Sequence, residues 1–307
     1  MKTVLITGGT GLIGKALTAM LISKGYEVII LSRSARTSDH KSVSYASWDV
    51  EKDAIDIAAI QKADYIIHLA GAGVADKRWT KKRKQEILQS RTKSGELLIK
   101  TLRENENKVK AFISSSAIGW YGPDNDASLK TGFKEDAPSS DDFLGNTCQQ
   151  WEQSTKPMET LGKRLVYLRT GIVLSNDGGA LKEFKMPVKF GIAAILGGGK
   201  QMISWIHIED ICRMYIYALE NEINGIFNAV APKPVSNKTL TLQLAKKMSG
   251  SFFIPIHVPA FVLKIVLGEM SIEVLKSATV NDDKIRNEGF RFVFPSIEAT
   301  LNDLIKK

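Results

Sequence analysis

The chain is poor in cysteine and lacks any long apolar run. Cys148 and Cys212 are the only cysteines among 307 residues, which excludes a disulfide framework and fits a reducing compartment. No apolar run approaches the roughly 18–20 residues needed to cross a bilayer. A strand-like segment begins within the first residues, so we expect no secretory signal. We therefore expect a cytoplasmic protein without a membrane partner.

Acidic residues are also in deficit. Lys and Arg number 42 against 33 Asp and Glu, a formal charge of +9 that could attract nucleic acid, an acidic membrane surface or a phosphorylated small molecule. The densest basic run, residues 77–84, fits either a solvated helix face or a rim that attracts phosphate. No nucleic-acid-binding module is recognisable, so we expect no nucleic-acid partner. The four histidines are scattered without metal-ligand spacing, and no metal site is expected.

The most informative segment lies at the start of the chain. Residues 4–7 are apolar or β-branched and predict a buried strand, and an apolar-periodic helix follows the glycine-rich turn. This strand–turn–helix order is the context that a dinucleotide-binding loop requires. Gly8 would permit the turn, Gly11 would let the backbone approach a pyrophosphate, and Gly14 would let helix and strand pack closely. The predicted cofactor contacts here are Gly8, Thr10, Gly11, Leu12, Ile13 and Gly14.

Strand and helix patterns alternate through the first half of the chain. Strands are expected at residues 27–31, 65–69, 111–115 and 165–169, with a long helix over 81–103. This alternation predicts an α/β fold: a Rossmann, doubly wound parallel sheet with a smaller α+β C-terminal substrate lobe. We assign residues 1–172 plus 203–230 to the dinucleotide-binding domain. Residues 173–202 plus 231–307, where prolines punctuate short helices such as 240–248 and 260–267, form the predicted lobe.

The end of the second predicted strand indicates which dinucleotide is bound. NAD-specific folds place a carboxylate there to bind the ribose 2′-hydroxyl, but residues 32–36 contain none. Ser32 can hydrogen-bond a 2′-phosphate, Arg33 offers a planar charged fork, and Arg36 could assist. The alternative is that these are ordinary basic loop residues. NADP(H) is therefore favoured over NAD, with Asp49 placed to touch the adenine amine.

Several short motifs together resemble one protein family. The chain is similar to extended short-chain dehydrogenases/reductases, within them to an atypical branch resembling nucleoside-diphosphate-sugar epimerases. The resemblance covers essentially the whole chain. It is carried by residues 7–14, 68–71, 75–79, 114–117, 151–152, 169–171, 204–207 and 289–292.

The resemblance implies further site residues. It places Leu69, Ala70 and Gly71 along the cofactor, with Glu86 and Arg91 reaching toward its ribose and nicotinamide half. It also adds two contacts on later strands, Ser114 and Ile172. His68 is expected to be a packed strand residue. Asp210 is expected to support the start of a helix.

Family chemistry uses a Ser or Thr together with a Tyr-x-x-x-Lys pair one helix later. Ser116 matches the serine position, but none of the seven tyrosines has Lys four residues on. Aligning Glu152 with the family's helix puts Leu144 at the tyrosine position and Cys148 at the lysine position. Leucine cannot transfer a proton, and a neutral thiol cannot replace an ammonium group.

Three substitutes for the missing pair can be considered. Tyr121 lies near Ser116 in sequence and could act as an acid, although packing explains it equally well. Cys148 could be a nucleophile, but an inert buried cysteine fits its neutral surroundings better. Glu86 or Glu152 could titrate in a closed pocket, with a capping or salt-bridge role as the simpler interpretation of Glu152.

The leading hypothesis is an NADP(H)-binding oxidoreductase or sugar-nucleotide epimerase, acting on a small molecule near Ser116. The substrate would be a nucleotide sugar or another carbonyl compound. The second hypothesis is a catalytically impaired scaffold that senses NADP(H) and presents a surface to a partner.

Overall fold

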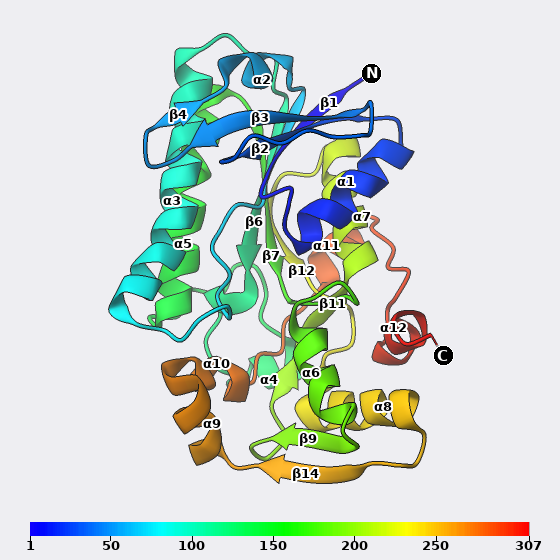
Figure 1. The fold of residues 1–307 in the computed structure, drawn as a ribbon. Coiled ribbons are helices and arrows are strands. Elements are labelled where there is room, and N and C mark those ends of the chain that lie inside the picture. Colours follow the sequence, from blue (N-terminus) through cyan, green and yellow to red (C-terminus); the bar gives the residue numbers. More distant parts are fainter. Residues whose placement is uncertain (307) are drawn as a thin grey trace.

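An eight-stranded sheet forms the centre of the larger part of the molecule. The computed structural model describes residues 1–306 and gives the strand order β12-β7-β6-β5-β1-β2-β3-β4, in which only β4 runs antiparallel to its neighbour (Figure 1). Its strands are β1 (Thr3–Thr7), β2 (Glu27–Ser32), β3 (Val43–Asp49), β4 (Ala54–Ile55), β5 (Tyr65–His68), β6 (Ala111–Ala117), β7 (Arg164–Thr170) and β12 (Gly225–Ala229). The four strands expected from the sequence are all present, and the predicted doubly wound α/β fold is confirmed.

Helices cover both faces of this sheet because successive strand residues point to opposite sides. Val4 and Ile6 pack with α1 (Leu12–Ser23) and α7 (Ile208–Glu220), whereas Leu5 packs with α2 (Ile57–Lys62) and α3 (Lys81–Glu104) on the other face. α5 (Phe143–Thr155) lies along α3 (Figure 1). Both faces are buried, which explains the continuous apolar runs of these strands.

A smaller lobe lies beyond the carboxyl ends of the large sheet (Figure 1). Three two-stranded sheets pair β8 (Ile172–Leu174) with β11 (Trp205–His207), β9 (Ile192–Leu196) with β14 (Ile254–Val258), and β10 (Met202–Ile203) with β13 (Val235–Ser236). The short helices are α4 (Ser128–Thr131), α6 (Ala180–Val188), α8 (Asn237–Ser249), α9 (Ala260–Leu267), α10 (Ser271–Leu275), α11 (Asp283–Asn287) and α12 (Ile297–Leu304). Both proline-flanked helices expected from the sequence are found, as α8 and α9.

The lobe has a core of its own, formed by α6, α8 and α12 around Trp205. The end of the chain is shared between the two parts. Ile285 and Phe290, inside the segment 231–307 that we assigned to the lobe, pack in the core of the large sheet beside α7. The large sheet thus holds α11 and the residues near Phe290, whereas α12 returns to the core of the lobe.

Candidate cofactor and substrate site

The turn between β1 and α1 is shaped so that only glycine fits at two of its positions. Gly8 has a φ of +68°, and a Cβ there would lie 2.8 Å from the carbonyl carbon of Leu69. A Cβ on Gly14 would lie 2.5 Å from the carbonyl oxygen of Gly8. The first glycine therefore permits the turn, and the second lets α1 pack against it, as expected from the sequence.

The amino end of α1 is left open toward solvent. Gly11 is its N-cap residue, no side chain caps it, and its first turn holds no acidic residue. Unpaired N–H groups and the positive end of the helix dipole make such a terminus a ready site for phosphate. Thr10 and Gly11 are exposed here, whereas the Ile13 side chain packs in the core and leaves only its backbone near the turn. Leu12 faces the glycine pair before α6, where a Cβ on Gly179 would lie 3.1 Å from Leu12 Cδ2.

A buried relay fixes the loop that follows β5. Thr7 Oγ1 accepts hydrogen bonds from the backbone N–H groups of Leu69 and Ala70, each at 3.1 Å, and lies 2.7 Å from His68 Nδ1. Because the hydroxyl has one proton, it is donated to Nδ1, which leaves Nε2 of His68 to donate to Ser94 at 3.3 Å. Burial lowers the pKa of His68 to about 4, so the ring stays neutral. His68 is thus a packed strand residue that holds the loop in place.

Arg91 stands directly behind this loop. Its Nη1 donates to the carbonyl oxygens of Ala72 and Ile87, and its guanidinium lies 4.9 Å from the centre of the Trp151 ring. A Cβ on Gly71 would lie 3.0 Å from Arg91 Cζ, so the glycine allows this close approach. Burial lowers the pKa of Arg91 to about 10, and the side chain remains charged. No carboxylate pairs with it within residues 1–306, which leaves a buried positive charge beside the predicted cofactor path.

The end of β2 presents the residues predicted to bind a 2′-phosphate. Ser32 is nearly buried and its hydroxyl donates to the carbonyl of Ser34 at 2.9 Å. Arg33 and Arg36 are exposed and form no ion pair with any described residue. Asp49, at the end of the neighbouring β3, accepts from the N–H groups of its own turn and pairs with Lys52 at 3.3 Å. Arg33 and Arg36 therefore have free polar groups, while Ser32 and Asp49 are engaged locally.

Glu86 and Ile172 do not point into the turn region in this structure. Glu86 is half exposed and pairs with Arg83 at 2.8 Å, a contact that lowers the pKa of this carboxyl. Arg83 in turn donates to the carbonyl of Gly73 and so holds the loop after β5. Ile172 is exposed on the short strand β8. Their predicted contacts with a cofactor stay predictions.

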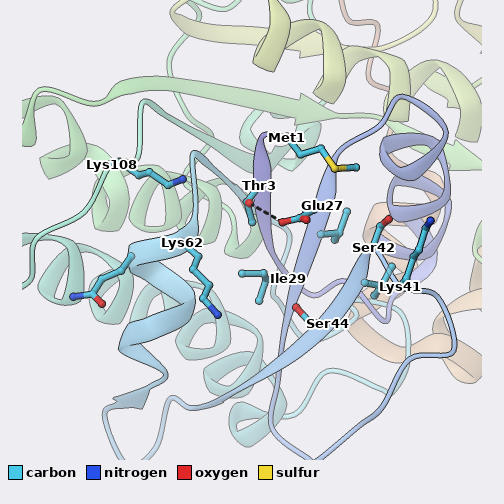
Figure 2. Close-up of a pocket in the computed structure, with 12 residues that line it drawn as sticks. Met1, Thr3, Glu27, Ile29, Lys41, Ser42, Ser44, Lys62 and Lys108 are labelled. Atoms are coloured by element: carbon cyan, nitrogen blue, oxygen red, sulfur yellow. Dashed lines mark hydrogen bonds between the residues drawn. The ribbon is translucent and has the colours of Figure 1, made fainter.

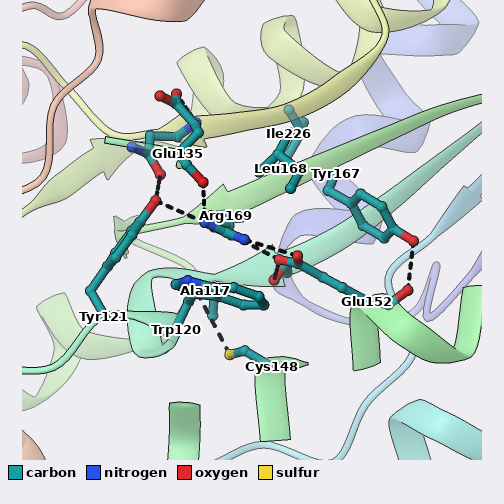
Figure 3. A network of polar contacts seen from close by, with 12 residues as sticks. Ala117, Trp120, Tyr121, Glu135, Cys148, Glu152, Tyr167, Leu168, Arg169 and Ile226 are labelled. Atoms are coloured by element: carbon teal, nitrogen blue, oxygen red, sulfur yellow. Dashed lines mark hydrogen bonds and ion pairs between the residues drawn. The ribbon is translucent and has the colours of Figure 1, made fainter. Parts of the chain in front are cut away.

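Ser116 lies near the end of β6 and contacts a buried polar network, of which Figure 3 shows Glu152 and Arg169. Its hydroxyl donates to Glu152 Oε1 at 2.7 Å, and Arg169 donates to the same carboxylate from Nε at 2.8 Å and from Nη2 at 3.0 Å. Burial opposes the charge on Arg169, but the hydrogen bonds and charge of Glu152 outweigh it and raise the pKa of Arg169. The ion pair interpretation of Glu152 thus matches its geometry. Ser114, two residues earlier, is fully buried and donates to the carbonyl of Ser115.

The same arginine ties in the second candidate acid, Tyr121 (Figure 3). The Tyr121 hydroxyl donates to Asn228 Oδ1 at 2.7 Å and accepts from Arg169 Nη1 at 3.1 Å, and the ring is fully buried. Burial raises the pKa of Tyr121 to about 12. The Trp120 ring stacks on the Arg169 guanidinium at 3.6 Å, which covers it from the other side. The hydroxyl of Tyr121 is thus buried and fully hydrogen-bonded, and its role as an acid stays a prediction.

Cys148 is the residue that the sequence predicts at the position of the family's lysine. It is buried, and its thiol lies 3.6 Å from the carbonyl of Ala117. Burial raises the pKa of Cys148 to about 12, so the thiolate is absent at neutral pH. A Cβ on Gly119 would contact both Leu144 and Cys148, which shows that these two side chains fill the space beside the end of β6. That Leu144 and Cys148 take the places of the family's proton-transfer pair stays a prediction from the sequence.

The helix start expected at Asp210 is found: His207 is the N-cap of α7, with its Nδ1 accepting from the backbone N–H of Glu209 at 3.0 Å, and Asp210 lies in the first turn, where a carboxylate favours the positive end of the helix. The Asp210 carboxylate also accepts from the N–H groups of Val293 and Phe294. It therefore anchors the C-terminal segment to the large sheet, a long-range contact that helix-start patterns do not contain.

Sequence reasoning missed Asn228 and the role of Arg169. Asn228 donates from its side-chain amide to the carbonyls of Phe133 and Asn281, and its backbone N–H donates to Glu135 Oε1. It joins β12 to two distant loops. The sequence did contain a signal for both residues, because an Asn or an Arg within an otherwise apolar strand is unusual. Their hydrogen-bond partners could be identified only from the fold.

Two surface cavities lie away from the glycine turn. One, of about 530 Å³, is at the amino ends of the strands and is lined by residues such as Thr3, Glu27, Lys41 and Lys62 (Figure 2). The other, of about 490 Å³, lies between the large sheet's loops and α10 and includes Lys276. Ligands of doubly wound folds bind at the carboxyl ends, so the first cavity is on the wrong edge for the cofactor. Within residues 1–306 no cluster of His, Cys, Asp or Glu is arranged to hold a metal ion, and no helix is long and apolar enough to span a bilayer.

Comparisons with known proteins agree with this geometry. The model of the NAD dependent epimerase/dehydratase family matches residues 4–142, and a domain of unknown function (DUF1731) matches residues 258–304. Epimerase family protein YfhF of Bacillus subtilis (strain 168) is 38% identical over 302 residues, covering 98% of this chain and 97% of the relative. The relative SSP1921 from Staphylococcus saprophyticus is 37% identical over 308 residues, covering 99% of this chain and 100% of the relative.

Solved structures resemble the whole chain. The human epimerase family protein SDR39U1, crystallised with NADPH, has a TM-score of 0.86 at 29% identity and covers 99% of both chains. UDP-N-acetylglucosamine 4-epimerase from Methanobrevibacter ruminantium M1, in complex with UDP-N-acetylmuramic acid, has a TM-score of 0.80 at 20% identity, covering 99% of this chain and 97% of that chain. The second likeness concerns the fold alone.

Proposed function

The chain belongs to the NAD dependent epimerase/dehydratase family, and on that premise we propose that it binds NADP(H) and acts on a small carbonyl or hydroxyl compound. The family and the fold support a nicotinamide dinucleotide as cofactor. The choice of NADP(H) over NAD(H) rests on the free arginines at the end of β2, and the human relative crystallised with NADPH supports it. When bound, the nicotinamide supplies a hydride donor or acceptor.

The observation that carries the proposal is the fit of the glycine turn to a pyrophosphate. Gly8 and Gly14 leave no room for a Cβ, and the N-terminus of α1 is open and free of acidic residues. The N–H groups after Gly11 would hold the pyrophosphate, and the side chains of Arg33 and Arg36 would bind the 2′-phosphate. Arg91, buried without a carboxylate partner, would contribute positive charge beyond the loop after β5.

Ser116 is the proposed contact for the reacting oxygen of the substrate. Its proton is donated to Glu152, so its oxygen is left to accept a hydrogen bond from a substrate hydroxyl. Ser116 is nearly fully buried, and a substrate reaches it only if the segment after β6 shifts. Glu152 and Arg169 position the serine, because both are locked in the buried ion pair.

Cofactor binding and turnover are tested separately. The melting temperature of the purified protein is measured with increasing NADPH and NADH, and NADPH is expected to raise it at lower concentration. Turnover is then measured on a panel of nucleotide sugars and simple carbonyl compounds, with Ser116→Ala as the variant expected to abolish it. A protein that binds neither dinucleotide at millimolar concentration refutes the proposal.

The positions of Leu144 and Cys148 favour a second candidate function. A side chain without an ionisable group and a thiol whose pKa burial raises to about 12 cannot replace the Tyr-x-x-x-Lys pair. A protein of this kind would bind NADP(H) and signal its binding to a partner without turnover. Saturable NADPH binding with no turnover across the whole panel, in the wild type and Ser116→Ala alike, would favour this candidate.

A further inference from the structure

Two segments of the smaller lobe contain no carboxylate at all. Residues 184–202 and 231–268 hold no Asp or Glu, although acidic residues make up 33 of the 307 positions in the chain. The two segments carry eight lysines: Lys185, Lys189, Lys200, Lys233, Lys238, Lys246, Lys247 and Lys264. None of these lysines forms an ion pair with a residue of the described chain, 1–306. Charge of one sign is thus concentrated in this lobe without local compensation.

The fold brings these segments together in the sheet formed by β9 and β14. Ala193 and Ile195 of β9 are fully buried and point toward α6 and α8. Ile192, Ala194 and Leu196 of β9 point to the opposite side of the sheet, because side chains alternate along a strand. The parallel register places Ile254 beside Ile192 and Ile256 beside Ala194. In Figure 1 this sheet lies at the end of the molecule farthest from β4, beyond α6 and α8.

The outward face of this sheet is apolar at every position. It consists of Ile192, Ala194 and Leu196 on one strand and Ile254, Ile256 and Val258 on the other. Ile254 is 67% exposed, and a phenylalanine precedes each strand, Phe190 at 77% and Phe252 at 88% exposed. The solvent-exposed face of a sheet normally carries polar side chains. We call these eight residues the apolar sheet face.

The helix that follows β14 continues this character. Phe261, Ile265 and Val266 of α9 are each more than half exposed, and Lys264 stands among them. Isolated exposed apolar residues are common, but so many large ones within residues 252–266 mark an interaction surface. Two exposed lysines adjoin these apolar residues in sequence: Lys189 directly precedes Phe190, and Lys264 directly precedes Ile265 of α9.

We propose that the apolar sheet face and α9 dock onto an anionic phospholipid bilayer, with the surrounding lysines contacting the lipid phosphates. Exposed Phe and Ile side chains enter the boundary between headgroups and acyl chains, and lysine stems reach outward to the charged headgroups. The two segments hold no carboxylate that an anionic surface would repel, and Glu269, the first one after α9, is paired with Lys84. The contact is peripheral and is distinct from a membrane span.

Other occupants fit the surface less well. A second copy of the chain, packed face to face, would bring two sets of unpaired lysines together with no carboxylate to neutralise them. Nucleic acid would match the lysines but not the projecting isoleucines and phenylalanines. A specific protein partner is expected to meet hydrogen-bonding groups of both kinds in a polar rim, whereas this surface offers lysines and apolar side chains. The proposal therefore departs from the expectation that a membrane takes no part.

Vesicle sedimentation of the full chain tests the proposal. Vesicles of phosphatidylglycerol mixed equally with phosphatidylcholine are compared with vesicles of phosphatidylcholine alone. We expect binding to the anionic vesicles, weakened by salt, and little binding to the neutral ones. Phe190→Ser with Phe252→Ser should lower the partition coefficient by roughly tenfold for each phenylalanine.

A matched pair of charge variants distinguishes binding through this surface from a general electrostatic attraction between the basic protein and the vesicles. Lys189→Glu with Lys264→Glu should reduce anionic-vesicle binding by roughly fivefold or more for each lysine. Lys41→Glu with Lys62→Glu makes the same change of charge at the opposite end, by the cavity of Figure 2, and should leave binding nearly unchanged. All substituted side chains are exposed, so an unchanged melting temperature confirms that each variant is folded.

Several results would overturn the proposal. The proposal is wrong if the wild type does not sediment with anionic vesicles, or if the phenylalanine variant binds them as well as the wild type does. It is also wrong if the two charge variants lose vesicle binding to the same extent. A wild type that is dimeric without lipid, and is made monomeric by the phenylalanine substitutions, would assign the surface to a second copy. None of these measurements uses NADPH, so their outcome is independent of the proposed cofactor and substrate.

Discussion

Of all single substitutions, Arg33→Ala is expected to change the affinity for NADPH most strongly relative to the affinity for NADH. The Arg33 side chain is exposed and has no ion-pair partner in residues 1–306, so its removal breaks no contact of the folded protein. Surface substitutions of this kind change the free energy of unfolding by less than about 0.5 kcal/mol. Any loss of binding can then be assigned to the cofactor contact itself.

The expected size follows from the chemistry of that contact. A hydrogen bond to a charged group contributes roughly 1.5–3 kcal/mol, which corresponds to about a 10- to 150-fold weaker binding of NADPH. Arg33 is exposed, and solvent screening places the effect toward the lower end. NADH lacks the 2′-phosphate, so its dissociation constant should stay within about twofold of the wild-type value. The ratio of the two constants is therefore the informative quantity.

Fluorescence titration with each dinucleotide measures both constants. Arg103→Ala removes another exposed arginine, on α3, and serves as the matched control with no expected effect on either dinucleotide. Arg36→Ala should give a smaller loss for NADPH alone. An equal loss for NADPH and NADH, or an unchanged affinity for NADPH, would contradict the assignment of the 2′-phosphate to Arg33.

Four further outcomes follow from the buried contacts. Gly14→Ala should lower the melting temperature and weaken both dinucleotides, because its Cβ would lie 2.5 Å from a turn carbonyl; wild-type behaviour in calorimetry would refute that packing. Glu152→Gln leaves a buried guanidinium without its counter-charge and should lower the free energy of unfolding by about 3 kcal/mol in urea titrations, clearly more than Ser116→Ala. The folded-state pKa of His68 is about 4, below its unfolded value, so protonation favours unfolding: stability should fall as pH drops from about 6.5 toward 4, by up to about 3 kcal/mol, and less so in His68→Gln. Cys148 should react with thiol reagents at pH 8 only at the rate of unfolding, since burial raises its pKa to about 12; rapid labelling of the native protein would show that the thiol is accessible.

The parts of the fold that were predictable depend on local patterns. The strand at residues 111–115 and the helix at 81–103 are long, periodic segments, and both appear within two residues of the expected bounds. The glycine turn was predictable because a tight turn and close packing leave glycine alone at those positions. These features arise from interactions between neighbours in sequence.

Long-range contacts account for what could not be predicted. Asp210 was expected to support the start of a helix and lies in its first turn, but its contacts with the N–H groups of residues 293–294 could not be predicted. Tyr121 was a candidate acid because it follows Ser116 in sequence, and only the fold shows that its hydroxyl bonds to Asn228 and Arg169. A sequence motif identifies which side-chain group is present, but the packing of the fold determines whether that group is free to bind or react.

The sequence by itself determined the family, the order of strands and helices, and the glycine turn with its open helix end, because each depends on residue types at fixed spacing. The tertiary structure alone decided how the buried charges pair, which hydroxyls are enclosed, and that two carboxylate-free segments form one apolar, lysine-bordered surface. Pairing and exposure depend on segments far apart in the chain, and the distance between them is set only when the whole core is packed.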